Sequence, residues 1–120
     1  MQYSRRWRNF DAGSEGFERA LRGRASRLLR GPGFRIAELQ ISPSQKVPWH
    51  YHNNVDDTFY VVQGTIRIFL QQPKEEIRLE HGQTYSVPPK RPHLVTNAGK
   101  TSAVFVVLQG IGEYDFVPLT

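Results

Sequence analysis

Apolar and polar residues alternate along this chain in short runs that are separated by turn residues, and this pattern predicts β-strands throughout. In the run 77–80, isoleucine and leucine alternate strictly with arginine and glutamate, so one side of that strand should face water. Turn signals recur roughly every 8–12 residues, which indicates an all-β sandwich or barrel. The strands predicted after residue 30 are Phe34–Ser42, a strand ending in the pair His50 and His52, Thr58–Gln63, Thr65–Gln71, Ile77–Glu80, Thr84–Val87, His93–Asn97 and Ser102–Gln109.

The N-terminal part of the chain is less regular. Residues 1–16 mix polar and aromatic side chains and predict an irregular arm, which Trp7 and Phe10 would attach to the barrel or to a second subunit. The apolar residues of segment 17–30 fall roughly along one face of a helix. Gly23 interrupts this pattern, and a central glycine costs a helix about 1 kcal/mol. We favour two short strands there, 18–21 and 26–29. The expected organisation is therefore an arm, 1–16, and a single β-domain, 17–120.

Two features of the later strands predict how they are arranged. Gly64 separates two predicted strands and is expected in the turn of a hairpin between them. The run Ala103–Leu108 is wholly apolar, which is typical of a strand that is buried on both faces. One face would line the interior of the sandwich, and the other would meet a terminal arm or a second copy of the chain. We therefore expect a homodimer.

The candidate chemistry begins at two histidines. His50 and His52 are two residues apart, so on a strand both imidazoles point to the same face, with Tyr51 on the opposite face. Asp57 opens the next predicted strand, and pairing of the two strands would bring its carboxylate to the imidazoles. Alternation places Asp56 on the opposite face, as a turn residue. Imidazole and carboxylate ligands suit zinc, iron, nickel, copper or manganese better than calcium or magnesium.

A second polar stretch, 82–97, follows a fixed spacing with Gly82, Pro88, His93 and Asn97. The first stretch reads His-x-His, four residues, Asp57, six residues and a glycine. Together the two stretches resemble the two sequence motifs of the cupin superfamily. This resemblance implies a double-stranded β-helix, also called a jelly-roll barrel, with a bound metal. The metal ligands it implies are His50, His52, Asp57 and His93.

The chain departs from the family pattern at three positions. Ser44 and Lys90 stand where the family has glycine, and Asp57 stands where it has glutamate. Aspartate is one methylene shorter, so two alternatives to direct ligation stay open. Asp57 could bind the metal through water, or the three histidines could hold it alone.

Other residues near the motifs have candidate roles. Phe59 is two residues from Asp57, so both side chains point to the same face of the strand. Phe59 therefore either lines the pocket beside the metal or belongs to the core. Glu38, on the preceding predicted strand, is a candidate acid close to the metal. For Asn97 we favour a cap at a strand end over a contact with a metal ligand. His81 lies beside a glycine turn and receives no role.

Charge and composition narrow the partners. The net charge is +5, and residues 1–35 carry nine arginines against three carboxylates. Such a field attracts anionic partners, but no nucleic-acid-binding motif accompanies the arginines, so we expect no nucleic acid. No apolar run approaches membrane-spanning length, so we expect no membrane association. Without cysteine or a secretory signal, a cytoplasmic location is expected.

The resemblance also bears on function. It implies metal-dependent enzymes such as dioxygenases, isomerases and decarboxylases, and also sugar- or effector-binding domains without chemistry. We favour a metal-dependent enzyme of the dioxygenase or isomerase type. Its substrate would be a small organic molecule, and anionic molecules are among the candidates. The alternative is a non-catalytic small-molecule or sugar-binding protein in which the metal is structural or orients the ligand. Fold alone does not choose between them.

Overall fold

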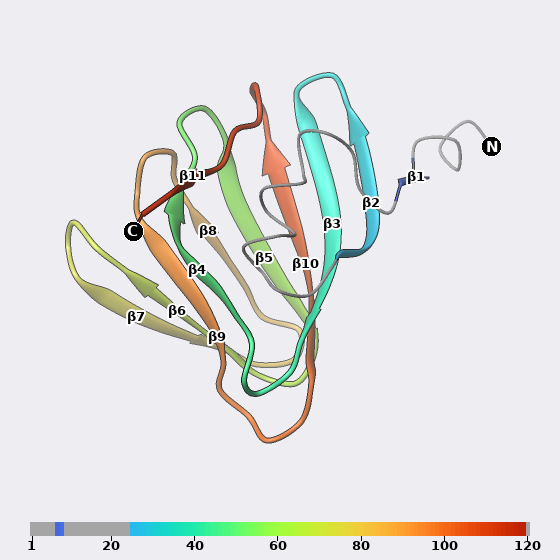
Figure 1. Ribbon diagram of the computed structural model, residues 1–120, viewed down its shortest axis with the longest axis vertical. Coiled ribbons are helices and arrows are strands. Elements are labelled where there is room, and N and C mark those ends of the chain that lie inside the picture. The colour runs from blue at the N-terminus through green and yellow to red at the C-terminus, as the bar shows by residue number, and fades with distance from the viewer. Residues whose placement is uncertain (1–6, 9–24, 120) are drawn as a thin grey trace.

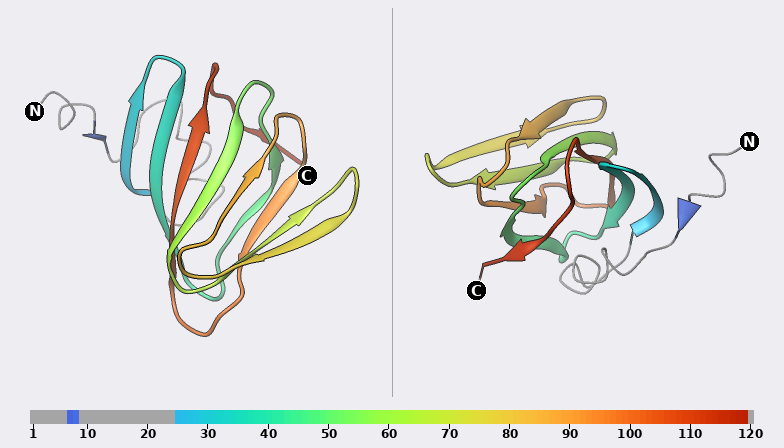
Figure 2. Two further views of the ribbon diagram at one scale, coloured as in Figure 1. Left: turned by 180° about the vertical axis from the view of Figure 1, so that it is seen from behind. Right: turned by 90° about the horizontal axis from the view of Figure 1, so that it is seen from above.

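The computed structural model describes residues 7–8 and 25–119, and all regular secondary structure among them is β-strand (Figure 1). The strands form two antiparallel sheets, and the views in Figure 2 show them as two layers of one sandwich. The six-stranded sheet runs in the order β1 (Trp7–Arg8), β2 (Ala25–Gly31), β3 (Phe34–Ile41), β10 (Ala103–Gly110), β5 (Asp56–Gln63) and β8 (Thr84–Val87). The five-stranded sheet runs in the order β11 (Val117–Pro118), β4 (Lys46–Tyr51), β9 (His93–Asn97), β6 (Ile66–Leu70) and β7 (Glu75–Leu79). The predicted all-β jelly roll is confirmed.

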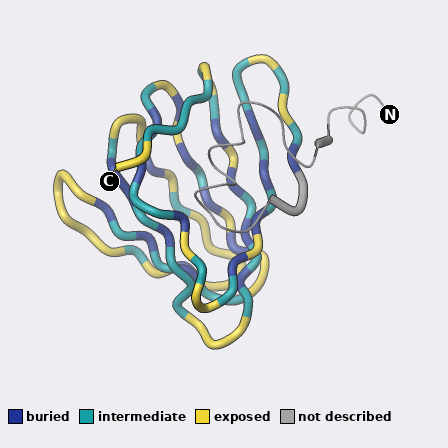
Figure 3. Tube along the Cα trace, viewed as in Figure 1, coloured by how far each residue is buried: buried dark blue, intermediate teal, exposed yellow. Residues whose placement is uncertain are grey.

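The core lies between the two sheets and follows the alternation of the sequence (Figure 3). On β3, Leu39 and Ile41 are fully buried while Gln40 is exposed, as the period of two requires. From the facing sheet, Ile66 and Ile68 on β6 are also fully buried. Truncating one such side chain to alanine typically costs about 2–5 kcal/mol, so these residues hold the sheets together and fix the positions of the strand ends.

The predicted hairpin around Gly64 is wrong, because β5 and β6 belong to different sheets. Gly64 has φ +81°, a left-handed conformation that favours glycine. A Cβ at this position would lie 3.0 Å from the Cα of Ala103. Glycine is therefore needed because the chain crosses from one sheet to the other close to β10. The histidine strand β4 and strand β5 do not pair either, since they lie in opposite sheets.

Among the described residues, one face of strand β10 is buried in the core; that a terminal arm or a second copy of the chain covers the other face stays a prediction. Phe105 and Val107 point into the core, with exposures of 0% and 2%, whereas Leu108 is 44% exposed. The reason is that β10 lies inside a single layer, between β3 and β5, and its even-numbered residues point away from the other sheet.

The N-terminal predictions are tested only in part. Trp7 and Arg8 form β1, which pairs with Leu29 and Leu28 at the edge of the six-stranded sheet. This part of the predicted arm is a short strand and is not irregular. The predicted strand 26–29 is present as β2, while the predicted strand 18–21 and Phe10 lie outside the described residues. Within the described part of the chain, no helix is long and apolar enough to cross a membrane.

Candidate metal centre

The fold brings four predicted site residues together from both sheets. His50 lies on β4, and His93 is its register partner on β9, while His52 follows directly after β4. Asp57 reaches them from β5 in the opposite sheet. The convergence predicted from sequence is therefore correct, but it occurs across the sandwich interior. All four side chains are at most 2% exposed.

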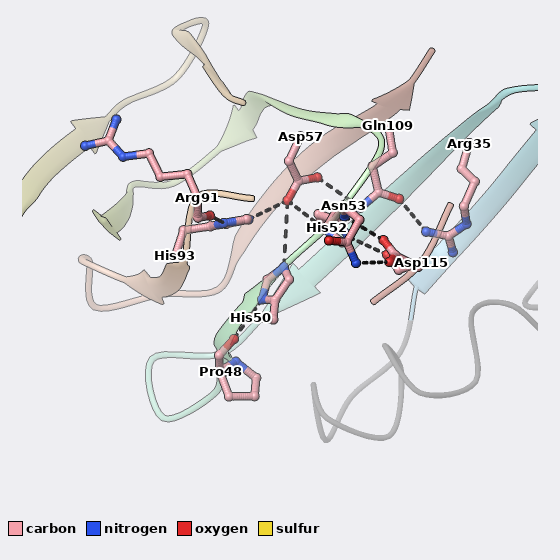
Figure 4. A network of polar contacts seen from close by, with 10 residues as sticks. All are labelled: Arg35, Pro48, His50, His52, Asn53, Asp57, Arg91, His93, Gln109 and Asp115. Carbon is pink, nitrogen blue, oxygen red and sulfur yellow. Dashed lines mark hydrogen bonds and ion pairs between the residues drawn. The ribbon is translucent and has the colours of Figure 1, made fainter. Parts of the chain in front are cut away.

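One carboxylate oxygen lies at the centre of the group (Figure 4). The Oδ2 atom of Asp57 is 2.6 Å from Nε2 of His93, 3.2 Å from Nε2 of His52 and 3.8 Å from Nε2 of His50. One potential ligand atom from each of the four residues lies within 4.8 Å of all the others. Ligand atoms about 2.1 Å from a shared metal are roughly 3.0–3.4 Å apart. The four donor atoms are thus gathered closely enough that the group could hold one metal ion.

Backbone carbonyl groups set the orientation of all three imidazoles. Nδ1 of His50 donates to the carbonyl of Pro48 at 2.8 Å, and Nδ1 of His93 donates to that of Arg91 at 2.9 Å. Nδ1 of His52 donates to the carbonyl of Asp115. A carbonyl oxygen only accepts, so each Nδ1 carries a proton, and Nε2 is the atom that each ring turns toward the cluster.

The second carboxylate oxygen of Asp57 has its own partner. Oδ1 accepts a hydrogen bond from Nε2 of Gln109 at 2.9 Å, and Oε1 of Gln109 accepts one from Nη1 of Arg35 (Figure 4). A guanidinium only donates, so the Arg35 contact fixes which end of the Gln109 amide faces Asp57. Gln109 and Arg35 are 1% and 3% exposed. This series of hydrogen bonds holds Oδ1 away from the histidines, so Oδ2 is the carboxylate oxygen that faces them.

The segment after β10 closes one side of the cluster. The ring of Phe116 stacks on His50, with centroids 4.6 Å apart and planes at 27°. The carboxylate of Asp115 accepts hydrogen bonds from the backbone and side-chain nitrogens of Asn53, at 2.8 and 2.7 Å. These contacts fix the loop after β4 and with it His52. The sequence predictions did not include Gln109, Arg35, Asp115 or Phe116 as site residues.

Burial and neighbouring charges shift the pKa values of three residues in the cluster. Burial lowers the pKa of His50 to about 4, and the neighbouring Asp57 only partly opposes this shift. Burial also acts to lower the pKa of His52, but the charge and hydrogen bond of Asp57 outweigh it and raise this pKa. Burial acts to raise the pKa of Asp57, yet the His52 charge and the histidine hydrogen bonds hold it well below its usual value. Asp57 is therefore a carboxylate at neutral pH, as a metal ligand must be.

The remaining predicted residues are now placed. Phe59 belongs to the hydrophobic core, and its ring also lies beside that of His93, with centroids 6.0 Å apart. Nδ2 of Asn97 donates hydrogen bonds to the carbonyls of Ile41 and Thr101. Asn97 thus caps a strand end, as favoured from the sequence. Glu38 as an acid near the metal is wrong, because on β3 it has the outward parity, between buried Ala37 and Leu39.

The other residues considered from the sequence are not members of the four-residue cluster. Asp56 and His81 are exposed. Lys90, at the position of a family glycine, has φ +69°, and its N–H donates to the carbonyl of His52 at 2.6 Å.

Comparison with known proteins agrees with this fold and site. The sequence pattern of the cupin domain matches residues 37–115, so the chain belongs to the cupin family. It is 30% identical over 82 residues to germin-like protein subfamily 3 member 1 of Arabidopsis thaliana, a match that covers 66% of this chain and 39% of the relative. A second curated relative, an uncharacterized protein of Methanocaldococcus jannaschii, is 28% identical over 72 residues, covering 60% of this chain and 56% of the relative. The chain thus spans about half the length of the curated relatives it matches, or less.

Solved structures show the same fold at low identity. An oxalate oxidase superimposes with a TM-score of 0.67 at 22% identity, covering 72% of this chain and 46% of that one. A protein with a double-stranded β-helix domain from Klebsiella pneumoniae superimposes with a TM-score of 0.68 at 20% identity, covering 77% and 80%. At these identities the likeness shows the fold alone.

Proposed function

We propose that this chain is a metal-dependent cupin in which His50, His52, His93 and Asp57 bind one divalent transition metal and act on a small anionic organic molecule. The observation that carries the proposal is the orientation of the imidazoles. Three separate backbone carbonyls hold the three Nδ1–H groups, so three Nε2 atoms face one carboxylate oxygen. A set of hydrogen-bonded core histidines without a ligand would not need all three Nε2 atoms directed to one point.

The residues of this chain would divide the work at the site. The three imidazoles supply neutral donors, and Asp57 supplies the negative charge that offsets a divalent ion. Gln109 keeps Oδ1 of Asp57 occupied, while the rings of Phe59 and Phe116 exclude water from two sides of the cluster. When bound, iron, manganese, zinc, nickel or copper supplies Lewis-acid or redox chemistry.

Two observations support an anionic substrate. The protein carries a net charge of +5, which raises the local concentration of anions. One structural neighbour is an oxalate oxidase that binds the substrate analogue glycolate, and another is an oxalate decarboxylase. We therefore propose small carboxylates as the first substrates to test, in oxidation, decarboxylation or isomerisation.

A second function is a binding protein in which the metal is structural or orients a ligand. It is favoured by the positions of the acidic groups in the described chain. Glu38 points outward, and the Asp115 carboxylate is taken up by Asn53, so neither is presented to the cluster as a general base. Under this alternative, metal-loaded protein binds small carboxylates without converting them.

The metal assignment is tested by elemental analysis of protein purified without added metal. The expected result is one transition metal per chain in the wild type and loss of stoichiometric metal in His50→Ala and His93→Ala, both still folded by circular dichroism. His81→Ala is the matched control, because this exposed fourth histidine should be replaceable without loss of metal. Full metal content in both site variants would overturn the assignment.

The choice between enzyme and binder needs a second assay on the loaded protein. Oxygen uptake and carbon dioxide release are followed with oxalate, glycolate and related acids. Turnover that is lost in His93→Ala and kept in His81→Ala supports the enzyme. Calorimetric binding of these acids without any turnover supports the binder.

A further inference from the structure

A cavity of ≈ 360 Å³ lies at the turn between β2 and β3, beside the segment that follows β10. Its described lining includes Arg30, Pro32, Phe34, Arg35, Glu113 and Tyr114. None of the four cluster residues is among the described residues that line it. A volume of this size is in the range of small-molecule sites, which are roughly 300–1,000 Å³.

The cavity brings two arginines together on neighbouring strands. Arg30 on β2 and Arg35 on β3 are register partners, so their side chains leave the same face of the sheet. Both guanidinium groups therefore contribute positive charge on the side of the sheet where the cavity lies. Arg30 is exposed, at the outer part of the cavity, and Arg35 is only 3% exposed, at its inner part. A ligand entering the cavity thus meets positive charge at both depths.

The other lining groups narrow the class of anion. Two arginines contribute positive charge to the described lining, and Glu113 contributes negative charge. Aromatic and proline side chains supply apolar walls, and the Tyr114 ring already lies 4.0 Å from the Arg35 guanidinium carbon. A planar carboxylate matches the fork of a guanidinium, and an apolar body matches these walls.

We propose that this cavity is a binding site for a small organic carboxylate, separate from the metal cluster. The carboxylate pairs with Arg35 and Arg30, and the apolar part of the ligand lies against Tyr114 and Phe34. The site does not depend on the proposed metal function. It nevertheless adjoins the cluster, since the Tyr114 ring is 5.5 Å from that of His52 and Arg35 is linked through Gln109 to Asp57.

The test uses benzoate as the probe and the full chain stripped of metal by dialysis against a chelator. Binding is measured by calorimetry, and its place is mapped from backbone amide NMR shifts. Benzoate should bind with the largest shifts at Gly33 and Gly112, which line the cavity. Neutral benzamide, which has the same shape, should bind at least about tenfold more weakly because it lacks the charge.

Two charge reversals locate the electrostatic contribution without touching a buried residue. Arg30→Glu changes an exposed residue at the cavity and should weaken benzoate binding roughly tenfold or more. Arg78→Glu is the matched control, because it makes the same charge change at an exposed position on β7 in the other sheet and should leave affinity within about twofold. Arg35→Lys, which keeps the charge but loses the planar fork, should also weaken binding.

Several results would overturn the proposal. These are the absence of benzoate binding, equal affinity for benzamide, equal effects of the two charge reversals, or shifts centred on His50 and His93. Because the protein is tested without metal, the result is independent of the metal assignment. A chain that binds no metal but binds benzoate at Gly33 and Gly112 would refute the proposed function and support this site.

Discussion

Replacing Gln109 with leucine isolates the contribution of a residue that touches a proposed metal ligand but not the metal. The substitution keeps nearly the same volume and removes the 2.9 Å hydrogen bond to Oδ1 of Asp57. It also removes the acceptor for Nη1 of Arg35. Partners that orient a metal ligand typically contribute 10–100-fold to affinity, so metal binding should weaken by about that factor.

The same structure predicts the effect of Gln109→Leu on stability. Asp57 and Arg35 are 2% and 3% exposed, so water does not readily replace the lost partner. A buried polar group that loses its partner costs about 1–3 kcal/mol, and two such groups give a loss of about 2–6 kcal/mol in the free energy of unfolding. Domains of this size are stable by roughly 5–15 kcal/mol, so a wild type near the middle of that range leaves the variant folded at 25 °C.

The assay is a competitive chelator titration on folded protein, with urea unfolding measured in parallel. Gln40→Leu is the control, because this exposed glutamine lies on the neighbouring strand β3 and should change neither quantity. Wild-type metal affinity in Gln109→Leu, or an equal change in both variants, would refute the role of Gln109 in positioning Asp57.

Three further predictions follow from the site and the outer surface. Asp57→Asn should weaken metal binding more than Asp56→Asn in chelator titrations, because Asp57 is buried among the imidazoles and Asp56 is exposed; equal losses would exclude Asp57 as a ligand. The raised pKa of His52 means that this imidazole keeps its proton to a higher pH than a free histidine does, and a metal that binds Nε2 must displace that proton. Metal affinity should therefore fall as pH decreases, with proton release in calorimetry in two buffers, and binding without proton release would contradict this. Finally, Tyr60 and Leu108 are 48% and 44% exposed on the outer face of one sheet, so a dimer is predicted; sedimentation equilibrium that finds only the 13.8 kDa species would contradict it.

Local pattern predicted the strands well and their partners poorly. Alternation identified the buried face of β3, and the spacing of polar residues identified β9, because both depend on neighbours in the chain. Whether two successive strands pair or cross between sheets depends on packing elsewhere. Gly64 illustrates this, because the same glycine fits a hairpin turn and a crossing, and only the approach of Ala103 decides between them.

The four residues of the cluster could be predicted because they match two sequence motifs of the cupin superfamily, whereas the residues that hold them in place could not. The carbonyl that orients His52 belongs to Asp115, and a backbone group leaves no signal in the identity of its residue. Gln109 did leave a signal. It has the parity of Phe105 and Val107, so alternation marks it as a polar residue on the buried face of an apolar strand. Its partner Asp57 could not be inferred without the register between β10 and β5.

The most direct test of the proposed metal centre is anomalous X-ray diffraction from crystals grown with cobalt, collected above and below the metal edge. The structure predicts one strong anomalous peak about 2.0–2.2 Å from Nε2 of His50, His52 and His93 and from Oδ2 of Asp57. A peak bound to the three histidines with Asp57 farther away would show a three-histidine site. A crystal whose anomalous peaks all lie elsewhere, for example at the exposed His81, would contradict the metal centre itself.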